Sequence, residues 1–293
     1  MTELSFNCPV CGNNSFTKTR ELVDYFLSKE RFGIIQCRTC GVLKTEPAPD
    51  AEHIGAYYES DEYLSHGDKQ KGIFAFLYRL AKGYNLGWKG RLLKNLYPST
   101  SFLDYGCGTG DLLSHCLELG FDVRGVEPNK SAKTQLSPLI QDKVVSPADE
   151  LNSNRKYDVI SLWHVLEHIP DPKEIIFELK KKLNVGGHLV IALPNNASAD
   201  ALHYGKHWAA WDVPRHLWHY RPEQIISMMT TQGFSHSESH PMWLDAYYVC
   251  LLSERYKKGN ALSALFWATI SNFKALFNKK ERCSSQVYVF QMN

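Results

Sequence analysis

The 293-residue sequence contains no run of about 18 apolar residues, the length that a membrane-spanning helix needs. Residues 1–8 also lack the basic and apolar regions of a signal peptide. An excess of one charge is missing as well, since 33 lysines and arginines stand against 31 aspartates and glutamates. The strongly basic surface of a nucleic-acid-binding protein is therefore not expected. We predict a cytoplasmic protein.

Disordered, collagen-like and disulfide-dense classes are excluded by composition, because 44% of the residues are hydrophobic and 22% are charged. The length allows one large domain or two. Eight cysteines are present, and in a cytoplasmic protein they are expected to be thiols or metal ligands rather than disulfides. Their distribution is uneven, since half of them fall within the first 40 residues.

The four N-terminal cysteines form two C-x-x-C pairs, and a glycine follows each pair. One pair is Cys8 and Cys11, and the other is Cys37 and Cys40. Four thiolates from two such turns suit a closed tetrahedral zinc site, which has no open position for catalysis. A segment this short buries little core, so a structural Zn²⁺ would stabilise it. We predict a zinc ribbon over residues 1–46; free thiols or a redox-active pair are the alternatives.

The next segment, residues 47–97, opens with prolines that indicate a domain boundary. Beyond them, aromatic and aliphatic side chains such as Phe74 and Tyr78 recur at helical spacing, which predicts a connector of two helices.

Strands and helices alternate from residue 98 onward, which predicts βαβ units and a parallel sheet. Expected strands cover residues 102–105, 122–126, 144–145, 157–163 and 188–193, and expected helices cover residues 111–119 and 173–183, the latter stopped by Gly186 and Gly187. Further along, we predict helices over residues 222–232 and 261–277 and strands over residues 246–252 and 286–291.

A glycine-rich loop lies between the first of these strands and its helix. Glycines occupy positions 106, 108 and 110, but Asp111 stands where the dinucleotide-binding pattern G-x-G-x-x-G requires glycine. Glu127 ends the next strand, about 20 residues past the first glycine, where an acid can bond the two hydroxyls of a ribose. No lysine follows the loop as in triphosphate-binding proteins. The pattern favours a nucleoside-containing ligand.

Together, the loop from Asp104 to Gly110, Glu127 and the segment from Tyr157 to Pro172 resemble class I S-adenosylmethionine-dependent methyltransferases. This resemblance covers about residues 98–252 and implies an α/β, doubly wound, Rossmann-like fold with seven mostly parallel strands and a reversed last strand. We predict this domain, with a C-terminal cap, over residues 98–293. The resemblance also implies the residues that hold S-adenosylmethionine. These are Asp104, Gly106, Cys107, Gly108 and Gly110 for the methionine part, Glu127 for the ribose, Asp149 for adenine, and Trp163 lining the pocket.

In such enzymes a segment before the core folds over the cofactor as a lid. Tyr57, Tyr58 and Tyr63 occupy that position here, and packing between domains is the alternative role for them. After the fourth strand, His164, Glu167 and His168 spell the H-x-x-E-H pattern of a protease family.

A long helix carrying both histidines is excluded by the preceding strand and by Pro170, so we reject the zinc protease. In the resembled family this segment lines the cofactor and acceptor pocket, where His164 would touch the reactive end. Satisfying local backbone groups is the alternative role for both histidines.

Residues 207–217 resemble zinc-ribbon-bearing methyltransferases of bacterial surface-sugar and secondary-metabolite pathways, with a Pro-Arg-His step. The resemblance implies a small-molecule or sugar-like acceptor. His216 is the candidate base because its ordinary pKa lies near neutrality, and Arg215 is a candidate polar contact. A purely structural loop is one alternative. A second metal site of His203, His207, His216 and His219 is another.

Residues 262–277 repeat apolar side chains at helical spacing, with lysines at and beyond the end. A cap helix on the core is one interpretation, and contact with a membrane surface is the other. Two other functions stay open: an RNA or protein methyltransferase, and a non-catalytic cofactor-binding module. The intact glycines and ribose acid favour an enzyme. Neither the acceptor nor the oligomeric state is indicated.

Overall fold

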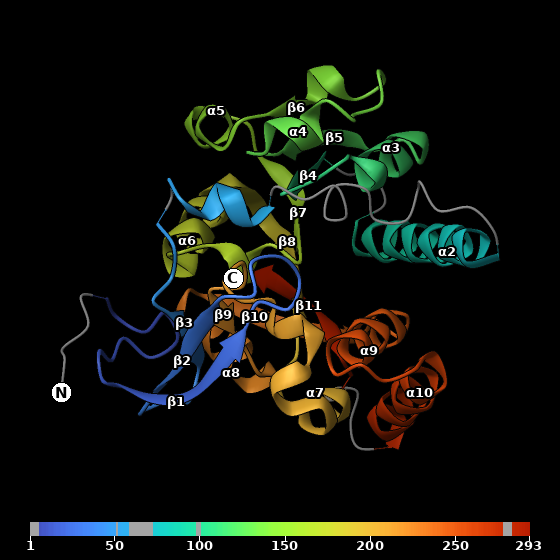
Figure 1. Ribbon diagram of the computed structural model, residues 1–293. Helices are drawn as coiled ribbons and strands as arrows, with labels where there is room; N and C mark the ends of the chain where they lie inside the picture. Colours follow the sequence, from blue (N-terminus) through green and yellow to red (C-terminus); the bar gives the residue numbers. More distant parts are fainter. Residues whose placement is uncertain (1–5, 51, 59–72, 98–100, 278–282) are drawn as a thin grey trace.

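The computed structural model describes residues 6–50, 52–58, 73–97, 101–277 and 283–293 (Figure 1). Within them, the larger of two sheets has the strand order β10-β11-β8-β7-β4-β5-β6. Its strands are β4 (Ser101–Tyr105), β5 (Asp122–Val126), β6 (Val144–Val145), β7 (Tyr157–Trp163), β8 (Leu183–Pro194), β10 (Phe234–Pro241) and β11 (Ser285–Met292).

Strands β6, β5, β4, β7 and β8 are parallel neighbours, whereas β11 runs antiparallel to both β8 and β10. This is the mostly parallel seven-stranded sheet with a reversed last strand that the sequence predicts. The carboxyl ends of the parallel strands meet at one edge, where ligands bind in open α/β sheets.

Side chains alternate between the two faces of the sheet, as the strand period of two requires. Val159 and Val190 face one side, where helices α2 (Ile73–Leu96) and α3 (Asp111–Glu118) cover them. Ile160 and Leu189 face the other side, beneath α6 (Pro172–Lys182) and α8 (Pro222–Thr231). Both faces are buried, which explains why these strands read as nearly continuous apolar runs.

The smaller sheet joins the N-terminal segment to the core. It consists of β1 (Phe16–Val23), β2 (Arg31–Cys37), β3 (Leu43–Glu46) and β9 (Trp218–His219), in that order and antiparallel. Strand β9 belongs to the segment after the fifth parallel strand, so the ribbon sheet extends into the methyltransferase-like part.

Besides the buried side chains on the two faces of the larger sheet, a third cluster joins the N-terminal ribbon to the C-terminal helices. It packs Phe32 and Ile34 of the ribbon against Trp208 and Trp211, with α7 (Ala199–Tyr204), α9 (Asp245–Tyr256) and α10 (Ala261–Phe277) on the far side. The ribbon and the cap therefore share one core.

The remaining elements are short. They are α4 (Lys130–Lys133), α5 (Pro147–Asn152) and the 3₁₀ turns η1 (Ile54–Tyr58), η2 (Gln141–Lys143), η3 (Leu166–His168), η4 (Gly205–His207) and η5 (Ala209–Trp211). Among the helices of the described residues, none combines the length and the hydropathy that crossing a bilayer requires.

Three expectations about elements need correction. Residues 246–252 lie in helix α9, not in a strand, and Gly186 and Gly187 lie inside β8, which begins directly after α6. The sequence also does not predict strand β10, because its residues are polar and mostly exposed. The two helices predicted for the connector stay a prediction, since the described residues contain η1 and α2 but not residues 59–72. The side chains of Phe74 and Tyr78 lie outside the described part.

Candidate active site

The glycine loop joins β4 to α3 and bonds back to β5. The N–H groups of Gly106 and Cys107 donate to the last carbonyl oxygen of β5 at 2.7 and 3.0 Å. Gly106, Gly108 and Gly110 have φ values of 82°, 56° and 75°, a region that favours glycine. A Cβ on Gly106 would lie 2.5 Å from a methyl of Val165, whereas one on Gly108 would meet no atom within 4 Å. The Gly108 backbone therefore lines open space that a ligand can approach closely.

Glu127 is buried directly after β5, beside that loop. Its Oε2 accepts a hydrogen bond from the N–H of Gly108 at 2.8 Å, and its Oε1 accepts one from the N–H of Asn129 at 2.8 Å. Each carboxylate oxygen can accept a second hydrogen bond. The carboxylate is thus fixed in place with capacity left for two neighbouring hydroxyls, as on a ribose.

Asp104 is buried near the end of β4, and its Oδ1 accepts a hydrogen bond from the hydroxyl of Ser161 at 2.6 Å. Burial raises the pKa of Asp104 to about 6, although Ser161 and the ammonium of Lys89 oppose the rise. Burial lowers the pKa of Lys89, whose Nζ lies 4.1 Å from the ring centroid of Trp163. A buried acid, an amine and an indole therefore gather near the ends of β4 and β7.

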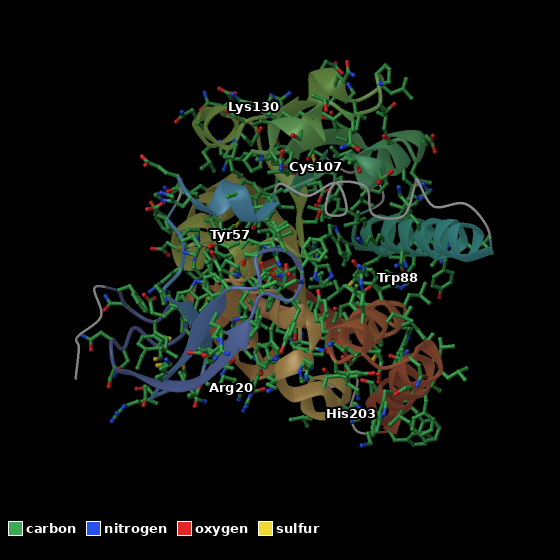
Figure 2. All side chains as sticks on the ribbon, in the orientation of Figure 1. Arg20, Tyr57, Trp88, Cys107, Lys130 and His203 are labelled. Atoms are coloured by element: carbon green, nitrogen blue, oxygen red, sulfur yellow. The ribbon has the colours of Figure 1, made fainter. Side chains whose placement is uncertain are left out.

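Trp163 ends β7 and packs edge-on against Trp88 of α2, with ring centroids 6.4 Å apart. Figure 2 labels Trp88 on that helix. The indole N–H of Trp163 has no hydrogen-bond partner in the described part of the chain.

Two further residues predicted to hold the cofactor are Cys107 and Asp149. Burial raises the pKa of the Cys107 thiol far above its usual range, so this cysteine is neutral and a poor nucleophile. Asp149, by contrast, is exposed in the first turn of α5 and accepts a hydrogen bond from the Ser146 hydroxyl at 2.7 Å.

His164 follows β7 in a left-handed conformation with φ 55°. Its Nε2 lies 3.1 Å from Oδ2 of Asp245, which is contributed by α9. Burial lowers the pKa of His164, but the carboxylates of Asp245 and Glu167 outweigh that effect and raise the pKa to about 9. His164 is therefore a partly exposed imidazolium at the carboxyl edge of the sheet.

Glu167 and His168 lie in the turn η3, and His216 reaches the same place from the loop before β9. One nitrogen or oxygen atom from each lies within 4.8 Å of the others. Although burial raises the pKa of Glu167, the imidazoles around it, led by His164, hold the pKa below its usual range. Burial and the nearby His216 lower the pKa of His168 to about 4. The cluster thus combines a buried carboxylate with a neutral imidazole.

Arg215 does not face this cluster, because its guanidinium is fully buried between two carboxylates. It donates to Asp24 at 2.9 Å and to Asp212, and its Nη1 donates to the backbone oxygen of Tyr57 at 3.0 Å. Asp24 also accepts three backbone N–H groups of the ribbon turn, including that of Ser28. The structure therefore favours a positioning role for Arg215 over contact with an acceptor.

Turn η1 of the connector closes over the same region (Figure 2 labels Tyr57). The hydroxyl of Tyr58 lies 2.9 Å from Nδ1 of His168. Tyr63 lies outside the described residues.

A cavity adjoins the cluster, and its walls are Glu167, Pro194, Asn196, Trp208, Ala210, His216, Trp218, His219 and Tyr220.

The four histidines of the alternative metal site are not brought together. His203 stacks on Trp267 with centroids 3.5 Å apart, and His207 packs near Tyr25. Sequence reasoning also missed Asp245, Lys89 and Asp24 and gave Glu167 no role. The only signal for Glu167 was its place in the H-x-x-E-H pattern. The other three residues gave no signal, because their contacts join positions far apart in the chain.

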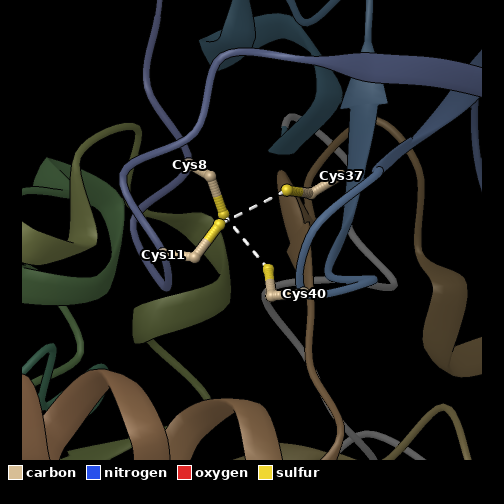
Figure 3. Close-up of side chains that lie close together, drawn as sticks. All are labelled: Cys8, Cys11, Cys37 and Cys40. Carbon is tan, nitrogen blue, oxygen red and sulfur yellow. Dashed lines mark hydrogen bonds between the residues drawn. The ribbon is translucent and has the colours of Figure 1, made fainter.

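The four N-terminal cysteines converge at the end of the ribbon (Figure 3). The sulfur atoms of Cys8 and Cys40 are 3.4 Å apart, and those of Cys11 and Cys37 are 3.5 Å apart. All four are free thiols, and tetrahedral zinc with bonds of about 2.3 Å separates its sulfur ligands by about 3.8 Å. The donor set therefore fits a structural zinc ion.

Comparison with known proteins places residues 77–238 in a family model described as a methyltransferase domain. The ubiquinone biosynthesis O-methyltransferase of Rickettsia akari is 26% identical over 190 residues, which cover 56% of this chain and 75% of that protein. The enzyme of the same name from Proteus mirabilis is 33% identical over 103 residues, 32% of this chain and only 41% of that protein.

Solved structures share the fold. Magnesium protoporphyrin IX methyltransferase from Synechocystis, with bound S-adenosylhomocysteine, has a TM-score of 0.54 at 14% identity and covers 83% of this chain and 100% of that one. An S-adenosylmethionine-dependent methyltransferase from Archaeoglobus fulgidus has a TM-score of 0.50 at 20% identity and covers 79% of this chain and 100% of that one. The family model matches more than half of the residues, and the sheet has the order and directions described above. The chain belongs to the methyltransferase-domain family and is an S-adenosylmethionine-dependent methyltransferase.

Proposed function

We propose that this enzyme methylates a small, hydroxyl-bearing molecule, aromatic or sugar-like, at the carboxyl edge of the larger sheet. The observation that carries the proposal is the gathering of Glu167, His168 and His216 just after β7, at the edge where ligands bind in open α/β sheets. The cavity beside them, between the buried indoles of Trp208 and Trp218, is about the size of one water molecule. It can therefore take a single polar group of the acceptor and not its whole ring.

The names of the curated relatives support a hydroxyl acceptor, because they are O-methyltransferases of ubiquinone biosynthesis. Their identity to this chain is low, so they favour the class of acceptor and not a particular compound.

For the cofactor, we propose that Glu127 binds the ribose of S-adenosylmethionine and that Asp104, Gly106, Cys107, Gly108 and Gly110 surround its methionine part. The open space at Gly108 and the remaining acceptor capacity of Glu127 fit this assignment. Asp149 is proposed for the adenine end, and Trp163 and His164 for the reacting end. The cofactor supplies a methyl group already activated on a sulfonium, so the protein mainly aligns the acceptor and excludes water.

We assign activation of the acceptor hydroxyl to His216. Its Nδ1 donates a hydrogen bond to the carbonyl oxygen of Ala210 at 2.9 Å, which leaves Nε2 as the available atom beside the cavity. Arg215 positions this residue indirectly, through the buried ion pair that fixes the loop.

A turnover assay tests the proposal. Purified protein with S-adenosylmethionine is offered phenols, catechols and nucleotide sugars, with RNA and protein fractions in parallel, and formation of S-adenosylhomocysteine is measured. We expect turnover with a small molecule and its loss in His216→Ala. The control is His236→Ala, on the exposed part of β10. Turnover confined to RNA or protein would overturn the proposal.

We further propose that the four cysteines hold Zn²⁺ and that α10 contacts a membrane surface carrying the acceptor. The observation behind the second statement is a row of exposed apolar side chains on α10. Residues 261–277 include no acidic residue, and Lys274 is exposed beside them. The exposed apolar side chains are Leu262, Leu265, Phe266, Phe273, Leu276 and Phe277.

A further inference from the structure

The cluster of Glu167, His168 and His216 has chemistry that the methyltransferase fold alone does not require. Among the described residues, only this cluster and the four cysteines gather three or more metal-ligating groups. The cysteines offer sulfur, whereas this cluster offers one carboxylate and two imidazoles. Such nitrogen and oxygen donors suit divalent ions of the first transition series.

Glu167 is the strongest sign of a missing partner. Its side chain is 1% exposed, yet neither carboxylate oxygen has a hydrogen-bond partner in the described part of the chain. The nearest imidazole nitrogens are Nδ1 of His164 at 3.5 Å and Nε2 of His216 at 3.9 Å, too far for good hydrogen bonds. These two contacts are long ion pairs, so both buried carboxylate oxygens keep unused capacity to accept a bond, and native proteins bond such oxygens or bind a metal to them.

Each of the two imidazoles has one ring nitrogen fixed by a backbone carbonyl and the other available to a metal ion. Nδ1 of His216 faces the carbonyl oxygen of Ala210 at 2.9 Å, and Nδ1 of His168 faces that of Arg215 at 2.9 Å. A carbonyl oxygen only accepts, so each ring carries its hydrogen on Nδ1 and keeps the lone pair on Nε2. Fixing one ring nitrogen on a backbone carbonyl while the other binds the ion is the usual support of a metal-bound histidine.

We propose that Glu167, His168 and His216 bind a divalent first-row transition-metal ion at the wall of the acceptor cavity. Three protein ligands leave a coordination position open, and the cavity that Glu167 and His216 line has room for one oxygen atom there. When bound, the ion would orient and polarise that oxygen and would take over its activation from Nε2 of His216, whose lone pair it occupies. This catalytic role rests on the proposed function, whereas the binding of the ion does not.

The two metal sites can be separated by ligand chemistry. Thiolates select zinc, while a carboxylate with imidazoles also accepts Mn²⁺. The experiment therefore titrates Mn²⁺ into the full-length, zinc-loaded protein and follows free Mn²⁺ by electron paramagnetic resonance. We expect one bound Mn²⁺ per chain, and at least tenfold weaker binding in both Glu167→Gln and His216→Asn.

The matched control is Glu254→Gln, which changes another buried carboxylate whose Oε2 has no hydrogen-bond partner in the described residues. It should bind Mn²⁺ as the parent does. Binding of S-adenosylhomocysteine and circular dichroism confirm that each variant is folded. Absence of Mn²⁺ binding by the parent at millimolar concentration overturns the proposal, and so does binding that both site variants retain.

Turnover is measured separately, so that failure of the metal site can be told apart from failure of the proposed methylation of a small molecule. Mn²⁺ binding that depends on Glu167 supports the site even if no small acceptor is found. If the ion binds but its removal leaves turnover unchanged, the polarising role is overturned.

Discussion

Asp104 shows at the scale of one residue how a ligand site opposes stability. Its carboxyl group is buried, and its pKa is raised to about 6 from an ordinary value of 3.8. Because the folded pKa is the higher one, the folded state binds more protons between these two values. The contribution of Asp104 to the free energy of unfolding therefore falls as the pH rises from about 4 to 6.

This linkage predicts the behaviour of Asp104→Asn, which mimics the protonated acid. The variant and the parent should be similarly stable near pH 4, and the variant should become more stable near pH 7, by about 3 kcal/mol at most. Urea unfolding at several pH values measures the difference. A constant difference across this range would contradict the assignment.

Glu127 carries the second prediction at this scale. If it bonds both hydroxyls of a ribose, Glu127→Ala should weaken binding of S-adenosylhomocysteine about 10- to 100-fold, as expected for losing hydrogen bonds to a charged group. Isothermal titration calorimetry measures the effect. Glu118→Ala, at the end of α3, serves as the control. Equal affinity in both variants would remove Glu127 from the cofactor site.

The sequence predicts local residues of the site better than distant ones. The glycine loop and Glu127 stand out because strand, turn and acid follow one another over about two dozen positions. Asp245 and Asp24 do not, since they meet His164 and Arg215 across 81 and 191 positions of the chain. Such pairs become visible only when the sheet and the ribbon have brought them together.

Elements were predictable where periodicity is clear. Strands β7 and β8 are mostly buried on both faces, so their sequences contain apolar runs that predict strands. Residues 246–252 resemble a strand by composition, yet the buried positions Ala246, Val249, Cys250 and Ser253 follow helical spacing and pack into the third core. A short apolar run can form either a strand or a helix, and the pattern alone does not distinguish them. Here the contacts with the third cluster stabilise the helix.

The exposed apolar side of α10 makes a prediction at the scale of an element. The parent should bind anionic liposomes, and the double variant Phe266→Ser/Phe273→Ser should lose that binding without unfolding, because both rings are more than half exposed. Co-sedimentation measures binding, and thermal melting checks the fold. Val185→Ser changes an exposed apolar residue on β8 and is the control. A parent that ignores liposomes would disprove the membrane contact.

At the scale of the whole molecule, the N-terminal four-cysteine ribbon is part of the enzyme's core. The backbone N–H of Thr45 in β3 donates to the carbonyl oxygen of Leu217 at 2.9 Å. The hydroxyl of Thr45 donates to the carbonyl oxygen of His216 at 2.7 Å. Gln224 of α8 donates to the carbonyl oxygen of Cys40 at 3.0 Å. The sequence predicted the ribbon but not its place, because a C-x-x-C pair carries no information about the surface on which it packs.

Loss of the ribbon metal should therefore weaken the whole chain. Cys37→Ser is expected to lose about one zinc per chain and to lower the melting temperature by roughly 5 to 10 °C, at about 2–4 °C per kcal/mol. Elemental analysis and calorimetry measure these quantities. Cys116→Ser, which changes a buried cysteine outside the ribbon, should keep its zinc. An unchanged zinc content in Cys37→Ser would contradict the four-cysteine site.

The ion pair between Asp24 and Arg215 has a consequence for how such enzymes diversify. One carboxylate holds the ribbon turn and also anchors the loop that carries His216. A chimera that takes its first 46 residues from one relative and its loop around residues 208–219 from another would keep the bonds inside the ribbon turn, but would set Asp24 against a loop that did not evolve with it. The two stretches should thus be inherited, and transplanted in the laboratory, as a single module.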